Sequence, residues 1–149
     1  MIVYQSTTVG ISPKQLHGFF VGWPNPPSPE THLRILEGST VVELALDEES
    51  TMIVGFVTAI SDGVSCAYIP HLEVLPAYQG RGIGTNLMTK LLTRLREHYM
   101  IDLLCDQSVQ SFYAAVGMQP AVGMCVRNYG HQAGIPQQHA VKGIEGCDR

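Results

Sequence analysis

A glycine-rich turn joins an apolar segment to an amphipathic one in the middle of this chain. Residues 72–84 read LEVLPAYQGRGIG, so that three glycines fall within five residues. Glycine permits positive φ and a close approach of the backbone to a ligand, and the first amides of a following helix have no intrahelical partner. A strand that runs through such a turn into a helix builds an anion-binding site, which indicates a phosphate-bearing cofactor.

The spacing of these glycines differs from that of two familiar phosphate loops. The dinucleotide fingerprint needs G-x-G-x-x-G after the first strand of a βαβ unit, and the P-loop needs G-x-x-x-x-G-K-[ST]. This chain instead has Q-x-x-G-x-G over residues 79–84, preceded by V-L-P-x-Y over residues 74–78. The combined pattern resembles the acetyl-CoA pyrophosphate motif of the GNAT superfamily of N-acetyltransferases.

A second motif lies downstream at the distance expected for this family. Residues 101–105 read as a buried strand, and F-Y-x-x-x-G-M follows over residues 112–118. This stretch resembles the family's strand–helix unit, which ends in F-Y-x-x-x-G-[FM]. The two motifs and their flanking elements cover roughly residues 64–126, and the rest of the chain agrees with the family by architecture only.

The resemblance implies an α/β fold of the mixed α+β kind. Its central sheet is mixed but mostly antiparallel, with six to seven strands and about four flanking helices. The hydrophobic patterns predict strands over 2–6, 40–46, 51–60, 64–74 and 101–105, helices near 12–20, 29–36, 82–98 and 106–117, and one or two closing strands within 118–128. We expect a single N-acetyltransferase domain over residues 1–129 and a loosely ordered tail over residues 130–149.

Pro70 lies inside the expected strand over residues 64–74. Proline cannot donate a ladder hydrogen bond, so we predict a bulge, or a local parting from a neighbouring strand, near this position. In the resembled family this strand does diverge from the next one, and the pantetheine arm of the cofactor lies in the gap.

Composition and charge limit the classes of partner that this chain can bind. The chain has 149 residues and a formal net charge of −4, which suits one domain and argues against nucleic acid as a partner. No apolar run approaches the ~20 residues of a membrane span, and the first residues do not read as a signal peptide, so we expect a cytoplasmic protein without a membrane partner. Four cysteines without C-x-x-C spacing predict no metal site. Among proteins similar to this one, homodimers are common.

The resemblance implies acetyl-CoA as cosubstrate, bound between the fourth and fifth strands. Backbone amides of the turn would hold the pyrophosphate, Arg81 would add a positive charge, and the amide of Val74 would hold the thioester carbonyl. Asp106 and Ser111 are close enough in sequence to line the same cofactor wall. The complete set expected to bind the cofactor is Val74, Gln79, Gly80, Arg81, Gly82, Ile83, Gly84, Thr85, Asp106 and Ser111.

Tyr113 is the candidate general acid. Periodicity alone places it on an apolar stripe, as a half-buried core aromatic. In the resembled family, however, the tyrosine at this place commonly lies beside the CoA sulfur and donates a proton to the departing thiolate. The resemblance therefore implies that role for Tyr113.

The general base is open between Glu73 and His71. Amine attack on a thioester requires a proton acceptor, and the two residues share one strand face, opposite Leu72 and Val74. Each also has an ordinary interpretation as a solvated strand residue. A nucleophilic Cys105 is disfavoured, because no histidine is adjacent in sequence and a thiol at the end of a buried strand would keep a raised pKa.

The predicted activity is transfer of an acetyl group from acetyl-CoA to a primary amine, directly within a ternary complex. A proline-rich loop that contains Trp23, together with the first two predicted helices, is expected to form the pocket for a small-molecule amine. A protein N-terminus is the alternative acceptor. The alternatives of another class are a non-catalytic CoA-binding sensor or interaction module, and a nucleotide-binding domain of a different fold.

Overall fold

The computed structural model describes residues 1–135 and 145–146, and its centre is a five-stranded sheet. The strands lie in the order β1 (Ile2–Gln5), β2 (Val41–Asp47), β3 (Met52–Ser61), β4 (Cys66–Val74) and β5 (Met100–Asp102). The first four pair antiparallel and β5 runs parallel to β4, which confirms the mixed, mostly antiparallel sheet. A separate ladder joins β6 (Val126–Arg127) to β7 (Glu145–Gly146), so the central sheet has five strands rather than six or seven.

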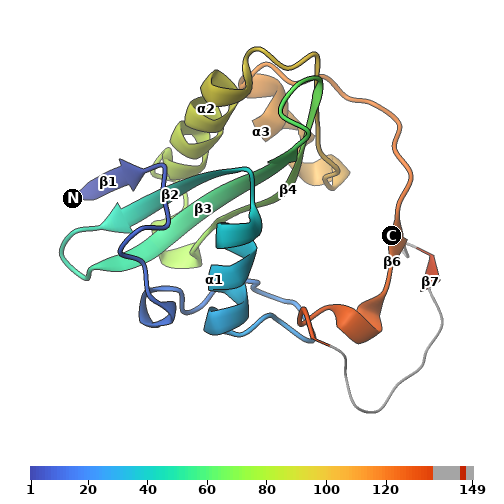
Figure 1. Cartoon of the computed structure of the whole chain (residues 1–149). Coiled ribbons are helices and arrows are strands. Elements are labelled where there is room, and N and C mark those ends of the chain that lie inside the picture. The colour runs from blue at the N-terminus through green and yellow to red at the C-terminus, as the bar shows by residue number, and fades with distance from the viewer. Residues whose placement is uncertain (136–144, 147–149) are drawn as a thin grey trace.

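Helices cover both faces of the sheet (Figure 1). On one side lies α1 (Pro29–Gly38), and on the other lie α2 (Ile83–Leu95) and α3 (Gln110–Ala115), so the described residues contain three α-helices rather than about four. Each face has its own apolar cluster. The α2 cluster includes Ala45, Val57, Ile83, Leu87 and Leu91, and the α1 cluster includes Leu16, Phe20, Leu36, Leu44 and Phe56.

The helix expected near residues 12–20 is wrong. Only a 3-10 turn forms there, at Pro13–Gln15, with Ser12 at its N-cap. The backbone then takes left-handed values, with φ of +86° at Gly18 and +60° at Phe20, and a right-handed helix cannot continue through them. Leu16 and Phe20 are nevertheless buried, as the apolar pattern indicated.

The predicted irregularity at Pro70 is present in β4. Thr58 of β3 faces His71, whereas Ile60 faces Tyr68, so β4 contains one extra residue between these pairs. Such a bulge leaves the extra residue unpaired and bends its strand. The parallel ladder to β5 also ends at Tyr68, just before the bulge.

The bulge reverses the side on which the end of β4 presents its side chains. Ala67 and Ile69 belong to the α2 cluster. Two residues further along, His71 pairs with Thr58, and Glu73 pairs with Phe56 of the α1 cluster. Paired residues in a ladder share a face, so the bulge moves the two candidate bases out of the α2 core.

The strand expected over residues 101–105 is shorter than predicted and only partly buried. β5 ends at Asp102, and Leu104 and Cys105 are exposed. The ladder from β4 stops at that point, and β6 does not join the central sheet, so neither β4 nor β6 covers these residues.

Beyond α3 the chain runs along one side of the molecule to β6 and then returns toward α1 (Figure 1). There the amide of Asn25 donates to Gln132 Oε1 at 3.0 Å. Most of the tail predicted over residues 130–149 lies outside the described residues. In the described part of the chain, no helix has the length and apolar character needed to cross a bilayer.

Candidate active site

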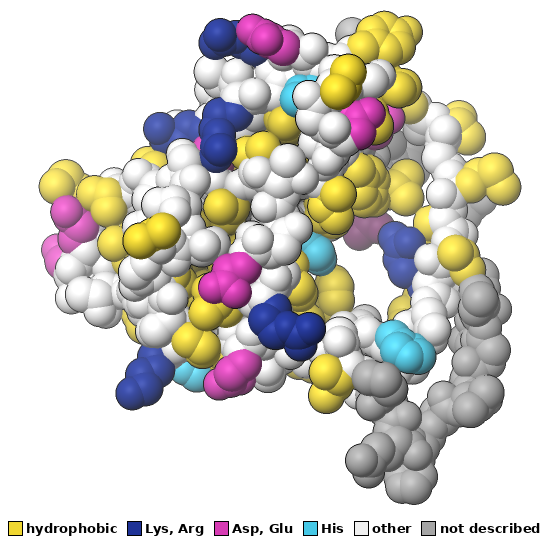
Figure 2. Space-filling model, in the orientation of Figure 1, with side chains coloured by type: hydrophobic (Ala, Val, Ile, Leu, Met, Phe, Trp, Pro, Cys, Tyr) yellow, Lys and Arg dark blue, Asp and Glu magenta, His cyan; other side chains and the backbone are white. Residues whose placement is uncertain are grey.

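An open hollow of about 1010 Å³ brings together residues that are far apart in the sequence. It lies between the end of β4, the loop after residue 19, the start of α3 and the segment that leads to β6. Figure 2 shows the opening between the body of the molecule and the C-terminal segment. Of the predicted site residues, it is lined by His71, Glu73, Gln79, Asp106 and Tyr113.

The glycine-rich turn has the geometry of an anion site. Gly80 and Gly82 have φ of +74° and +77°, and a Cβ at either would meet nothing within 4 Å. The left-handed Gly82 begins α2, and no side chain in the described part of the chain caps that helix. Among the described residues no acceptor binds the amides of residues 80–85, so these donors are available to phosphate oxygens.

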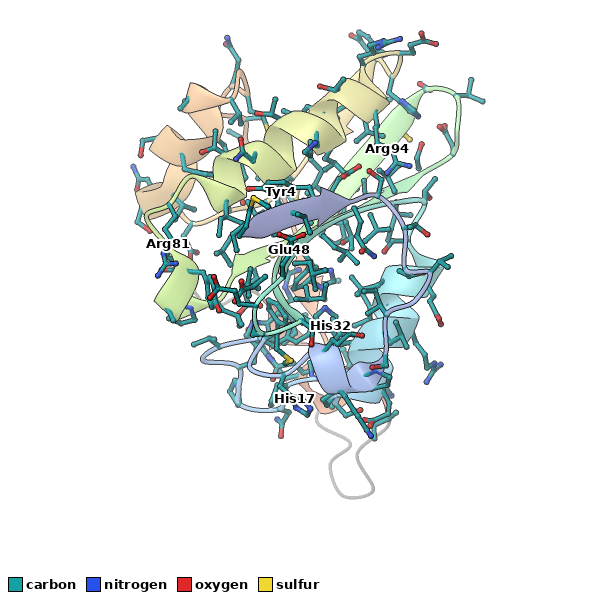
Figure 3. All side chains as sticks on the ribbon, turned by 90° about the vertical axis from the view of Figure 1, so that its left-hand side faces the viewer. Tyr4, His17, His32, Glu48, Arg81 and Arg94 are labelled. Atoms are coloured by element: carbon teal, nitrogen blue, oxygen red, sulfur yellow. The ribbon has the colours of Figure 1, made fainter. Side chains whose placement is uncertain are left out.

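Side chains of the turn hold it in place. Gln79 Nε2 donates to the carbonyl oxygen of Val74 at 2.9 Å, and the Gln79 amide donates to Pro76. The free amides therefore begin at Gly80 and not at Gln79. Arg81 donates to Ala77 O at 3.0 Å, which fixes its charge at the periphery of the turn, where Figure 3 shows it.

The amide of Val74 points toward the gap between β4 and β5. Leu75 N donates to Val54 O at 2.9 Å, and Val74 pairs with Gly55. Hydrogen-bonded and non-hydrogen-bonded pairs alternate in an antiparallel ladder, so the N–H of Val74 is directed away from β3. Since the β5 ladder has already ended, this donor faces the side where the cofactor is expected.

Tyr113 projects from α3 into the hollow as a half-buried side chain. Burial raises the pKa of its hydroxyl above the usual tyrosine value, and the nearby Cys105 raises it further. No described residue makes a hydrogen bond to this hydroxyl. The group therefore stays protonated at neutral pH and can donate a proton to a ligand.

His71 and Glu73 share the α1 side of the sheet, as the strand period predicted. The Nδ1 atom of His71 lies 3.4 Å from the hydroxyl of Thr58, and burial lowers the pKa of the ring. His71 is therefore neutral at pH 7 and can accept a proton.

Glu73 has a second role that sequence reasoning missed. Its Oε2 accepts a hydrogen bond from the amide of Phe20 at 2.8 Å, and its Oε1 accepts one from the amide of Val21 at 3.1 Å. Phe20 has φ of +60°, a conformation that costs a non-glycine residue about 1 to 3 kcal/mol. The carboxylate thus stabilises a loop that is strained.

Aromatic rings form one part of the wall of the hollow. The Phe20 ring lies 5.0 Å from Trp23 and 5.8 Å from His71, and Trp23 lies 6.4 Å from His71, all between centroids. Phe56 lines the same hollow, and the expectation that Trp23 and its neighbours shape a pocket agrees with this arrangement.

His32 lies behind this wall, in the interior between α1 and the sheet (Figure 3). It is 1% exposed, and neither ring nitrogen has a hydrogen-bond partner among the residues that the structure describes. Its pKa is lowered to about 4, first by burial and then by the charge of His71. Glu30 and Glu37, on the same helix, do not line the hollow.

Some predicted residues fall outside the hollow, and other residues enter it. Ser111 is exposed and does not line it. Met124 and Arg127 line it, although their local sequence carries no signal for a site. Among residues 1–135, no three His, Cys, Asp or Glu side chains are placed so that they could hold a metal ion.

The site combines a sheet that parts after a bulge, a glycine-rich helix start with free amides, and a hollow lined by both Tyr113 and His71. Residues 11–118 match the model of the Acetyltransferase (GNAT) family, and the chain belongs to that family. It is therefore an acyltransferase.

Known proteins show how far the likeness extends. The crystal structure of an assigned acetyltransferase from Deinococcus radiodurans R1 matches with a TM-score of 0.87 and 47% identity, over 91% of this chain and 94% of that one. The uncharacterized N-acetyltransferase ycf52 of Porphyra purpurea is 32% identical over 77% of this chain and 69% of its own length. The ycf52 protein of Pyropia yezoensis is 29% identical over 65% of this chain, which spans 58% of that protein.

Proposed function

We propose that this acyltransferase moves an acetyl group from acetyl-CoA to the primary amine of a small molecule, directly within a ternary complex. The single observation that carries the proposal is the hollow itself. It is bordered by a protonated Tyr113 and a neutral His71, and it opens beside the free amides of the glycine-rich turn.

The residues of the turn fit a pyrophosphate. Unpaired amides, two left-handed glycines and an uncapped helix start supply donors and a positive dipole end without a competing side chain. The amides of residues 80–85 would hold the phosphates. When bound, acetyl-CoA supplies the activated acetyl group, and Asp106 would lie along the cofactor wall.

Three groups of the chain then have defined roles. The N–H of Val74 would donate to the thioester oxygen, where negative charge develops during attack. His71 would accept the proton that the amine loses, directly or through water, and Tyr113 would donate a proton to the sulfur of CoA. Glu73 remains the alternative proton acceptor, since it lies on the same face as His71.

The aromatic wall supports a small amine as the acceptor. An ammonium group is attracted to aromatic faces, and an apolar substituent would pack against Phe20 and Trp23. A protein N-terminus is the alternative acceptor, because the hollow is open at the surface (Figure 2). A homodimer stays a prediction, to be tested by light scattering.

The first test is thermal stability measured in parallel with acetyl-CoA, CoA, ATP and NAD. A ligand at 100 times its dissociation constant adds about 2.7 kcal/mol to the folded state. A shift confined to the two CoA species supports the cofactor assignment. An equal shift with ATP, or none with CoA, overturns it.

The second test is release of free thiol from acetyl-CoA in the presence of a panel of amines. The panel should contain phenethylamine, putrescine, glucosamine and a short peptide with a free N-terminus. Amine-dependent thiol release supports catalysis and identifies the acceptor class. If CoA binds but no amine releases thiol, the alternative of a non-catalytic CoA-binding module is favoured.

A further inference from the structure

We propose that Glu73 is a positioning residue, which holds the loop of residues 20–23 in the conformation that forms the acceptor wall. This inference rests on the proposed function. It distinguishes between the two candidates for the general base, which are the carboxylate of Glu73 and the imidazole of His71. His71 accepts the proton, and Glu73 acts through the loop.

The geometry around the carboxylate is that of an anion in a backbone nest. Consecutive amides, of Phe20 and Val21, each donate to a different oxygen of Glu73. Phe20 has the left-handed backbone conformation, which lets its own N–H group and that of Val21 point toward one place. Such backbone concavities bind anions. The loop and β4 are joined across more than 50 residues of sequence by this contact.

The contact fixes the orientation of the aromatic wall. The amide of Trp23 donates to the carbonyl of Phe20 at 3.1 Å, and Gly22 between them has φ of +81°. The loop is thus a tight turn whose first amides are held by Glu73. Since both its oxygens face the loop, the carboxylate is directed at the backbone and not at an acceptor amine.

His71 has the opposite arrangement. One ring nitrogen contacts Thr58, and no described residue binds the other, Nε2. Its ring faces the Phe20 ring edge to face, at an interplanar angle of 89°. An ordered loop therefore also restrains the imidazole of His71, so that Glu73 positions the wall and the base together.

Trp23 is the only tryptophan of the chain, so its fluorescence reports on this loop alone. We would compare Glu73→Gln with His71→Gln and with Glu48→Gln, a control that removes a charge from an exposed carboxylate far from the hollow. The expected result for Glu73→Gln is a red-shifted Trp23 emission and easier quenching by acrylamide. Glu48→Gln should leave both signals close to those of the wild type, and His71→Gln, which keeps the contact of Glu73 with the loop, should change them less than Glu73→Gln does.

The kinetic readout uses the acceptor with the highest turnover in the amine panel. For Glu73→Gln we expect KM for that amine to rise about tenfold, because the acceptor is no longer oriented. The affinity for CoA and the acidic limb of the pH profile should be unchanged. If Glu73 were instead the base, Trp23 emission would stay unchanged while turnover fell and the acidic limb disappeared, and this result would overturn the proposal.

The fluorescence measurement needs neither acetyl-CoA nor an acceptor. If Glu73→Gln shows a red shift and retains the circular dichroism of the wild type, Glu73 holds the loop in place even if no amine is acetylated. Failure of the proposed function is therefore distinguishable from failure of this inference. If Glu73→Gln does not fold, Glu73→Asp shortens the side chain while keeping its charge, and the same red shift is expected. Unchanged Trp23 emission in the folded variant contradicts the proposal that Glu73 holds this loop.

Discussion

The two sides of the hollow are built in different ways. The proposed cofactor side is local in sequence: one stretch of 13 residues contains the end of β4, the turn and the start of α2. The acceptor side is nonlocal, because the loop of residues 20–23 depends on Glu73 of β4 and packs against His71 and Phe56. A local site can be recognised in the sequence as a motif, whereas a nonlocal site forms only after the chain has folded.

The two sides also differ in the residues that take positive φ values. Positive φ falls on glycine at residues 80 and 82, where it needs little compensation. On the acceptor side it falls on Phe20, where the carboxylate of Glu73 offsets it. We therefore expect changes on the cofactor side to act on cofactor binding alone, and changes on the acceptor side to act on several properties at once.

The largest effect should come from Tyr113, the proposed general acid. Tyr113→Phe removes the hydroxyl that we propose as the proton donor, and kcat should fall by about 100-fold or more. CoA affinity measured by calorimetry should change little, because the ring remains in place. A variant with wild-type kcat would show that another group protonates the thiolate.

A substitution in the glycine-rich turn tests the local character of the proposed cofactor side. Gly82→Ala introduces a Cβ at positive φ, and we expect KM for acetyl-CoA to rise about tenfold as the turn shifts. Gly63→Ala is the matched control, since Gly63 also has positive φ and open space around it but lies in the β3–β4 hairpin. Equal effects of the two variants would mean that general strain, and not the turn, is responsible.

The pH profile tests which group accepts the proton. Burial lowers the pKa of His71, so its neutral form should persist below the ordinary value of about 6.5. In the wild type kcat/KM should therefore fall only as pH drops below that value, where His71 becomes protonated. His71→Gln should lower kcat/KM at pH 7 by about 100-fold and remove this acidic limb. An unchanged limb in that variant would exclude His71 as the base.

The last prediction concerns stability on the acceptor side. In the folded protein His32 has a pKa of about 4, whereas in the unfolded chain it titrates near the ordinary value of about 6.5. Between these values the unfolded chain binds more protons, so stability falls as pH drops. We expect the wild type to lose about 2 kcal/mol more than His32→Phe between pH 8 and pH 5 in urea unfolding. Parallel losses in both proteins would refute this origin.

Much of the fold could be predicted from local patterns. The alternation of apolar residues located β2, β3 and β4, and the four-residue spacing of leucines located α2. The predictions failed where long-range contacts decide: the helix near residue 12 gave way to a loop bound to Glu73, and the strand over residues 101–105 shortened where β4 bulges. Neither the contact with Glu73 nor the bulge in β4 can be predicted from the residues adjacent to these two segments.

By itself, the sequence determined the cofactor turn, because glycine conformation and the free amides of a helix start are properties of adjacent residues. It also determined that His71 and Glu73 share a face, since strand side chains alternate with period two. Which face they share was decided only by tertiary structure. The bulge in β4 adds one residue to the register, and in a ladder one residue is enough to exchange the buried side for the side of the hollow.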